Sequence, residues 1–97
     1  MRVMLRARLD TQVSNEAIKN GTLPKIVQSV TEQLKPEAAY FGPCDGGRTA
    51  TFVFDMQDSS EIPAITEPFF LELGAEIEVY PVMNAEDLRK GLAALQG

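Results

Sequence analysis

The segment Arg2-Val3-Met4-Leu5-Arg6-Ala7-Arg8-Leu9 decides the fold, because its residues alternate between two kinds of side chain. One set, Val3, Leu5, Ala7 and Leu9, is apolar, and the other set consists of three arginines and one methionine. Successive side chains of a β-strand point to opposite faces of a sheet, so this period of two predicts a half-buried strand. Its apolar side is expected to face the core.

The segments after this strand alternate between helical and extended patterns. Helices are expected over residues 14–19, 22–35, 58–73 and 84–95, and strands over residues 38–42, 48–55 and 75–83. A tight hairpin is expected at residues 43–47, where Asp45-Gly46 is a typical turn sequence. The order β-α-β-β-α-β-α is typical of the split-βαβ, ferredoxin-like fold. We therefore expect a single α+β domain over residues 1–97, with a four-stranded antiparallel sheet and its helices on one face.

Individual residues mark the expected helix ends. Ser14 and Thr22 are expected to cap the first two helices, and Asn84 forms a capping-box pattern with Asp87 at the start of the last. Pro68 lies deep inside the third helix, where its missing N–H predicts a kink or a restart. Gly91, inside the last helix, indicates a close approach of another backbone.

Composition excludes several classes of function. The 97 residues include 14 acidic and 9 basic side chains, for a net charge of -5. This balance disfavours nucleic acid and anionic membranes as partners. Histidine is absent, which removes the commonest general base and metal ligand, and no cofactor is expected. The single cysteine, Cys44, cannot form an internal disulfide, and neither a signal peptide nor a membrane-spanning run is visible, so we expect a cytoplasmic protein.

The second face of the predicted sheet is mixed in character. It should carry Arg6 and Arg8 from the first strand opposite Glu76 and Glu78 from the last. Apolar side chains join them on the same face: Met4, Tyr40, Val53, Tyr80 and Val82. A face with this much apolar area usually requires a cover. We expect a symmetric homodimer in which two copies pack sheet to sheet.

Four short strings carry a resemblance to a known group of proteins: Pro36-Glu37-Ala38-Ala39-Tyr40-Phe41, Gly47-Arg48-Thr49-Ala50, Glu67-Pro68-Phe69-Phe70 and Pro81-Val82-Met83-Asn84-Ala85-Glu86-Asp87-Leu88. With the layout of nearly the whole chain, they resemble the dimeric α+β-barrel superfamily, and within it a group of small bacterial proteins of unknown function. The superfamily includes antibiotic-biosynthesis monooxygenases, muconolactone isomerases and stress-responsive barrel proteins. The resemblance implies a ferredoxin-like dimer. Haem-using relatives rely on a histidine, which this chain lacks, so no haem is implied.

The candidate ligand-binding residues are Arg6, Tyr40, Tyr80, Glu78 and Glu67. Arg6 could hold an anionic group in a bidentate manner, or it could belong to a cross-strand ladder of charges. The two tyrosines could orient a ligand, or cover a core edge with their hydroxyls in water. Glu67 precedes Pro68, and its carboxylate could reach the sheet or bond an amide that the proline frees.

Other features favour structural explanations. Cys44 has no histidine to act as its base, and Gly46-Gly47 precedes a strand rather than a helix, as a plain hairpin turn does. Residues 47–54 are similar to the third-strand motif of ferredoxin-like RNA-binding sheets. Their base-stacking positions, however, fall on Thr49 and Thr51 instead of aromatic residues, which excludes that function.

Two functions remain. The first and favoured one is a homodimer that binds a small organic molecule between its sheets without catalysis, because the sequence offers no nucleophile–base pair or metal set. The second is a cofactor-independent isomerase, cyclase or monooxygenase acting on a small aromatic or lactone compound. It would use Tyr40, Tyr80, Arg6 and either Glu67 or Glu78 for proton transfer.

Overall fold

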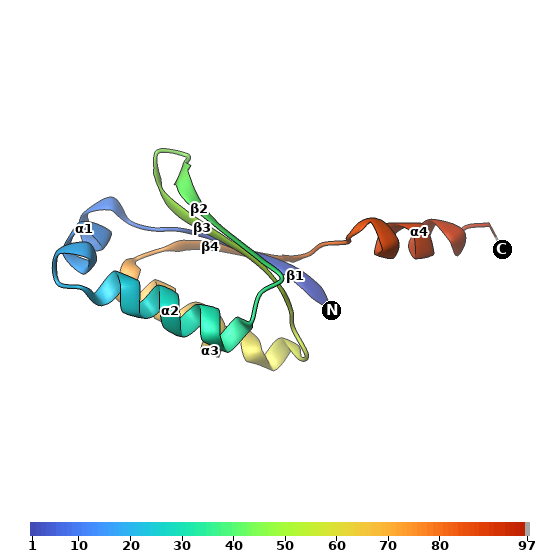
Figure 1. The fold of residues 1–97 in the computed structure, drawn as a ribbon, viewed down its shortest axis with the longest axis horizontal. Coiled ribbons are helices and arrows are strands. Elements are labelled where there is room, and N and C mark those ends of the chain that lie inside the picture. The colour runs from blue at the N-terminus through green and yellow to red at the C-terminus, as the bar shows by residue number, and fades with distance from the viewer. Residues whose placement is uncertain (97) are drawn as a thin grey trace.

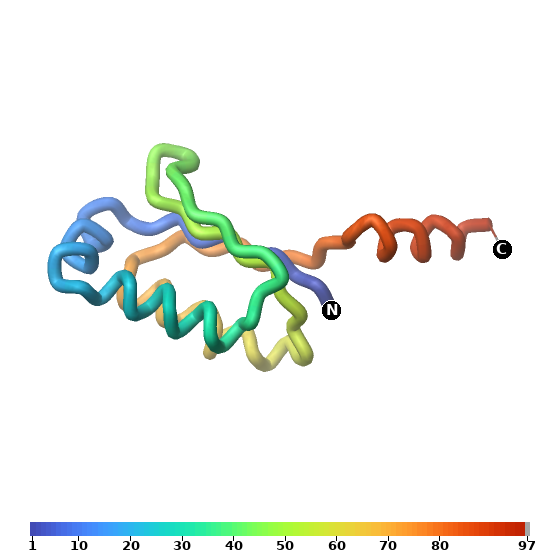
Figure 2. The backbone as a smooth tube through the Cα atoms, viewed as in Figure 1, coloured from blue at the N-terminus to red at the C-terminus, as the bar shows by residue number. Residues whose placement is uncertain are grey.

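The computed structural model describes residues 1–96. Strands β1 (Arg2–Arg8), β2 (Ala38–Cys44), β3 (Gly47–Asp55) and β4 (Glu76–Pro81) form one antiparallel sheet in the order β2-β3-β1-β4. Helices α1 (Thr11–Lys19), α2 (Thr22–Leu34) and α3 (Ile62–Leu73) lie on one side of this sheet, and the short 3-10 helix η1 (Ser59–Glu61) leads into α3 (Figure 1). Helix α4 (Ala85–Ala93) lies beyond the end of the sheet (Figure 2). The expected ferredoxin-like α+β order is confirmed.

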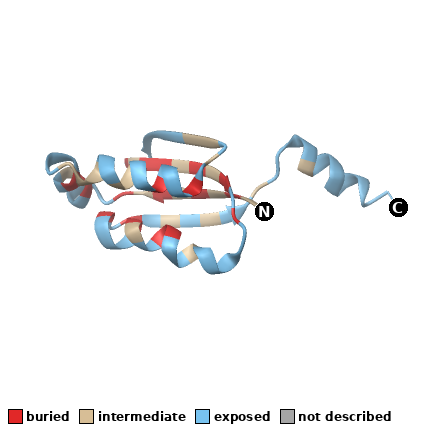
Figure 3. Cartoon of the chain, turned by 60° about the horizontal axis from the view of Figure 1, so that its bottom comes forward, coloured by how far each residue is buried: buried red, intermediate tan, exposed pale blue. Residues whose placement is uncertain are grey.

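Strand β1 lies at the centre because both of its neighbours continue its alternation. Leu5 is opposite Phe52 of β3 and Val79 of β4, so apolar residues form a continuous row across three strands. Leu5 and Phe52 are fully buried beneath the helices. On α3, Leu73 is also fully buried and Phe69 is only 1% exposed. Figure 3 shows this burial on the sheet and on the helix surfaces that face it. The prediction that the apolar side of β1 faces the helices is confirmed.

Two of the turns with positive φ angles have the residues expected for them. Asp45 and Gly46 join β2 to β3 with φ angles of 52° and 76°. This pair matches the Asp-Gly hairpin turn predicted from sequence. Gly74 ends α3 with a φ angle of 55°, and it permits the chain to enter β4 at once.

Two predicted helix caps are wrong. Asp10 caps α1, because its carboxylate accepts a hydrogen bond of 2.9 Å from the Val13 N–H, while Ser14 lies buried inside the helix. Gly21 occupies the cap position of α2, which leaves Thr22 as the first helical residue. Helix α1 begins at Thr11, earlier than predicted, with an aspartate that is as good a cap as serine, and Gly21 adopts the left-handed conformation that the turn requires.

The third and fourth helices bear on three further predictions. Of the kink or restart predicted at Pro68, the restart is absent, because α3 is continuous from Ile62 to Leu73, and buried Ile65 and Phe69 hold its two halves against the same sheet. No heavy atom outside α4's own backbone lies within 4 Å of a Cβ added at Gly91, so the expected close approach is absent from the described chain. The capping box of Asn84 and Asp87 is present. Across residues 1–96, no helix is both long and apolar enough to span a lipid bilayer.

Candidate functional site

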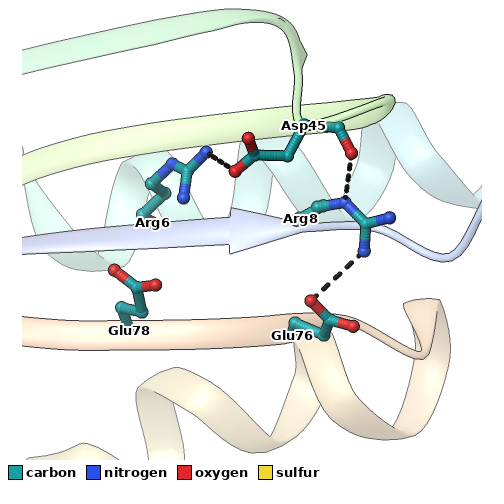
Figure 4. Close-up of a pocket in the computed structure, with 5 residues that line it drawn as sticks. All are labelled: Arg6, Arg8, Asp45, Glu76 and Glu78. Atoms are coloured by element: carbon teal, nitrogen blue, oxygen red, sulfur yellow. Dashed lines mark hydrogen bonds and ion pairs between the residues drawn. The ribbon is translucent and has the colours of Figure 1, made fainter.

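A polar depression lies on the sheet face that the helices leave open, and we call it the sheet-face cleft (Figure 4). It has a volume of about 280 Å³ and is lined by Arg6, Arg8, Asp45, Glu76 and Glu78. Pairing of β1 with β4 sets Arg6 opposite Glu78 and Arg8 opposite Glu76. The β2–β3 hairpin supplies Asp45. The alternation of β1 and β4 therefore gathers charged groups where the sequence predicted them.

The charges of the sheet-face cleft bind mainly to one another. Arg6 donates one hydrogen bond of 2.8 Å to the Asp45 carboxylate and another of 2.8 Å to the Cys44 sulfur. Arg8 donates to the Asp45 carbonyl oxygen at 3.0 Å and forms an ion pair with Glu76 at 3.2 Å. The hydrogen bond from Arg6 holds the pKa of the Asp45 carboxyl below its usual range. A ligand entering the cleft therefore has to compete with pairs that already exist.

The structure brings together only some of the predicted ligand-binding residues. Arg6 and Glu78 are direct cross-strand neighbours, and Tyr40 lies in the same row beyond Thr51. Tyr80 is on the opposite edge strand from Tyr40, and its hydroxyl donates to the Met4 sulfur at 3.0 Å. The two tyrosines therefore flank the open face from its two edges and do not converge.

Glu67 lies apart from the other candidates. It is an exposed residue of α3, the helix that packs on the covered side of the sheet. The sheet therefore separates its carboxylate from Arg6, and the two cannot act on one ligand within a single chain. Among residues 1–96, no group of three potential ligands from His, Cys, Asp and Glu is close enough to hold a metal ion.

A second depression, on the covered side of the sheet, is apolar, and we call it the apolar hollow. It has a volume of about 350 Å³ and lies between α2 and the β2–β3 hairpin. Buried Phe69 and Leu73 of α3 form its floor, Leu23 and Val27 of α2 form one wall, and Phe41 of β2 stands at the other. The hairpin turns away from α2 in Figure 1, and its Phe41 is exposed to solvent.

The hollow exists because a large residue and a small one are neighbours in the sheet. Phe41 of the edge strand pairs with Ala50 of β3, whose methyl group leaves space above it. The Phe41 ring leans instead onto Phe52 in an edge-to-face contact with centroids 5.7 Å apart, and 57% of the residue stays exposed. An aromatic residue this exposed on the core side of a sheet marks incomplete coverage by the helices.

Arg48 is the charged residue that lines the apolar hollow. Its Nη1 donates to the Ser14 hydroxyl at 2.7 Å and to the Thr11 carbonyl oxygen at 3.3 Å. These contacts fix the guanidinium against α1 and account for the buried hydroxyl of Ser14. A guanidinium has five N–H donors. The hydrogen bonds that Arg48 forms within residues 1–96 use only its Nη1.

Sequence reasoning missed this second depression. Its residues come from five separated parts of the chain, and no local pattern unites them. The available signal was the apolar pair Phe41 and Pro43, which alternate onto the core side of an edge strand. We predicted a strand over residues 38–42, which includes Phe41 and ends before Pro43, and assigned no partner to the Phe41 side chain.

The comparisons with known proteins place the chain within a family. A search of curated proteins finds no match. Among solved structures, the de novo designed protein Ferredog-Diesel is similar, with 12% sequence identity, a TM-score of 0.48, and coverage of 84% of this chain and 85% of that chain. The model of the family described as "Domain of unknown function (DUF3303)" matches residues 1–96. The chain therefore belongs to the DUF3303 family.

Proposed function

We propose that this protein binds, without catalysis, a small organic acid that has an apolar body and one anionic group. The ligand lies in the apolar hollow, with its body between α2 and Phe41 and its anionic group on Arg48. The observation that carries this proposal is the lining of the hollow, which is apolar except for Arg48 and Thr49. Ligand sites commonly combine apolar walls with a few placed polar groups, in volumes of roughly 300–1,000 Å³.

The hollow supplies affinity through burial. Its floor is already ordered, because Phe69 and Leu73 are packed against the sheet and almost inaccessible to water. An apolar ligand body removes the walls around Leu23, Val27 and Phe41 from water, which stabilises the complex by about 25 cal/mol per Å² of apolar area. A preformed floor reduces the entropy lost on binding.

Arg48 supplies specificity for an anion. Hydrogen bonds from a guanidinium to a carboxylate are charge-assisted and stronger than neutral ones. Its contacts with Ser14 and Thr11 hold the guanidinium in place before the ligand arrives. Little side-chain entropy is therefore lost when the acid binds.

The chemistry of the lining favours binding over catalysis. An arginine side chain offers hydrogen-bond donors and no acceptor, so the lining contains no general base. The Thr49 hydroxyl donates to backbone carbonyl oxygens, that of Cys44 at 3.2 Å and that of Gly47 at 3.1 Å, so its proton is already engaged. The alternative, an isomerase, cyclase or monooxygenase using Arg6, Tyr40, Tyr80 and a carboxylate, is less favoured because its tyrosines stand on opposite edges of the sheet.

The proposal includes a homodimer formed through the open sheet face. Support comes from one row of that face, in which Ala38, Val53, Met4 and Tyr80 are consecutive cross-strand neighbours. This apolar row lies beside the charged residues of the sheet-face cleft. Association removes the row from water and leaves the apolar hollow, on the other side of the sheet, open to its ligand.

A thermal-shift screen tests the ligand proposal. The probes are phenylacetate, cinnamate and octanoate, each beside its uncharged methyl ester. A ligand at 100 times its Kd raises the free energy of unfolding by about 2.7 kcal/mol. We expect Val27→Trp, which fills the hollow, to abolish this gain. Ser29→Trp adds the same ring on the exposed side of the same helix and is expected to preserve it.

Three outcomes contradict the proposal. The first is stabilisation by none of the acids. The second is equal stabilisation of the Val27→Trp and Ser29→Trp variants. The third is stabilisation by an acid that is lost in the Arg6→Gln variant and kept in the Val27→Trp variant. That result would place the ligand in the sheet-face cleft.

A further inference from the structure

We propose that α4 docks on a second copy of this chain. Three leucines of the C-terminal segment, Leu88, Leu92 and Leu95, form a leucine stripe that covers the partner's apolar row of Ala38, Val53, Met4 and Tyr80. The inference rests on the proposed homodimer and names the segment that forms it. It is independent of the apolar hollow.

Helix α4 is well formed locally but unpacked. Its start has a complete capping box, in which the Asn84 side chain accepts from the Asp87 N–H at 2.8 Å and Asp87 accepts from the Asn84 N–H at 3.1 Å. Leu88, Leu92 and Leu95 nevertheless remain 45%, 53% and 78% exposed. Figure 3 shows α4 standing apart from the body with almost all of its surface exposed.

A helix of this length requires a partner. Isolated helices shorter than about 12–15 residues are marginal in water, and packing of an apolar face stabilises most helices in proteins. The spacing i, i+4 places Leu88 and Leu92 on one side of α4, and Leu95 follows at i+7 in the turn just after the helix. The helix therefore has both the need for an apolar surface and the side chains to cover one.

The chain's own body does not provide that surface. Arg2 of β1 binds both Glu37 and Asp87, and the Val82 N–H donates to the Arg2 carbonyl oxygen at 3.2 Å. These contacts hold the first turn of α4 at the end of the sheet, and the helix then leads away from it (Figure 1). The molecule is consequently 56 Å long but only 27 Å and 17 Å in its other dimensions.

The apolar row of a second copy meets the requirements of the leucine stripe. It crosses four strands, which at about 4.8 Å between neighbours gives a width of about 14 Å. The stripe runs seven residues, or about 10 Å at 1.5 Å per residue. Tyr80 lies just before the segment that leads into α4, so the row and the helix occupy the same end of the molecule. A two-fold axis at that end brings each helix to the other copy's row, with both contacts equivalent.

Paramagnetic relaxation tests this contact between two different molecules. One sample is the Cys44→Ser, Gln96→Cys protein, with a nitroxide attached to the new cysteine. It is mixed with an equal amount of ¹⁵N-labelled Cys44→Ser protein, which has no cysteine and carries no nitroxide. We expect broadening of amide signals at Ala38, Met4, Val53 and Tyr80. Broadening confined to other surfaces, or no intermolecular broadening in a sample that sediments as a dimer, overturns the inference.

A matched pair of variants supplies a second test, by sedimentation equilibrium. Leu92→Asp places a charge in the leucine stripe, and Ala93→Asp places the same charge outside the stripe, about 100° around the same helix. We expect Leu92→Asp to weaken the dimer at least tenfold and Ala93→Asp to change it less than twofold. Equal dimerisation of both variants overturns the inference and leaves the homodimer standing. A wild-type monomer at 100 µM overturns both, whereas the ligand screen of the hollow is unaffected.

Discussion

The sheet-face cleft and the apolar hollow are depressions of similar size on opposite faces of one sheet. The cleft measures about 280 Å³ and the hollow about 350 Å³. Arginines of the cleft are bonded to Asp45 and Glu76, whereas the walls of the hollow contact solvent. Similar volumes therefore have different meanings: in the cleft the protein satisfies its own groups, and in the hollow it leaves apolar surface uncovered.

The difference determines what each depression can gain from a ligand. In the cleft, a ligand has to compete with the pairs that Arg6 and Arg8 already form, and a bond that replaces one of these changes the free energy little. In the hollow, a ligand removes apolar surface from water and no protein contact has to break. Charged residues in a depression are thus a weaker indication of a binding site than unfilled apolar walls.

The largest expected effect concerns the floor of the hollow. Leu73 is fully buried, and Leu73→Ala should lower the free energy of unfolding by about 2–5 kcal/mol, because it leaves a cavity next to Phe69. Leu71→Ala, on the exposed side of the same helix, should change it by less than about 0.5 kcal/mol. Urea unfolding measures both. Similar losses for the two variants would mean that α3 faces the sheet differently.

The next effect distinguishes the arginines of the two depressions. Arg48→Gln should weaken binding of an organic acid about tenfold, since one charge-assisted hydrogen bond is worth roughly 1.5–3 kcal/mol and glutamine replaces part of it. The methyl ester should bind to both proteins alike. Arg6→Gln, in the sheet-face cleft, serves as the control, with an expected change below twofold. Isothermal titration calorimetry measures the affinities, and a larger loss for Arg6→Gln would transfer the site to the cleft.

The smallest effect is the response of the cleft to acid. Arg6 lowers the pKa of Asp45, so this carboxyl stabilises the folded state above its unfolded pKa of about 3.9 and loses that contribution as the pH falls through the lower, folded value. The N-terminal ammonium lowers the pKa of Asp55 in the same direction. The melting temperature should therefore decrease as the pH is lowered beyond about 4. Asp45→Asn should reduce that fall slightly, and an unchanged or steeper acid dependence in this variant would contradict the assignment.

Local sequence patterns predicted most of the fold. The alternation through Leu5, the Asp45-Gly46 turn and the Asn84 capping box each depend on residues close together in the chain, and all three are confirmed. The cap predicted at Ser14 failed because the helix starts at Thr11, and the cap predicted at Thr22 failed because the left-handed Gly21 precedes it. Ser14 is buried for a nonlocal reason, its bond to Arg48, which no local rule contains.

The candidate site was less predictable than the fold. Arg6 and Glu78 were expected to share a face because strand alternation fixes which way side chains point, and the structure places them opposite each other. Glu67 does not lie on that face. Its position in a predicted helix did not indicate that the sheet would lie between its carboxylate and Arg6. The apolar hollow depends on the distance between α2 and Phe41, a property of packing that appears only in three dimensions.

A methyl NMR titration with phenylacetate tests the central claim, that the apolar hollow and not the sheet-face cleft receives the ligand. We predict chemical-shift changes at the methyl groups of Leu23, Val27 and Leu73, with those of Met4 and Val53 on the open face unchanged. Changes confined to Met4 and Val53 would contradict the account.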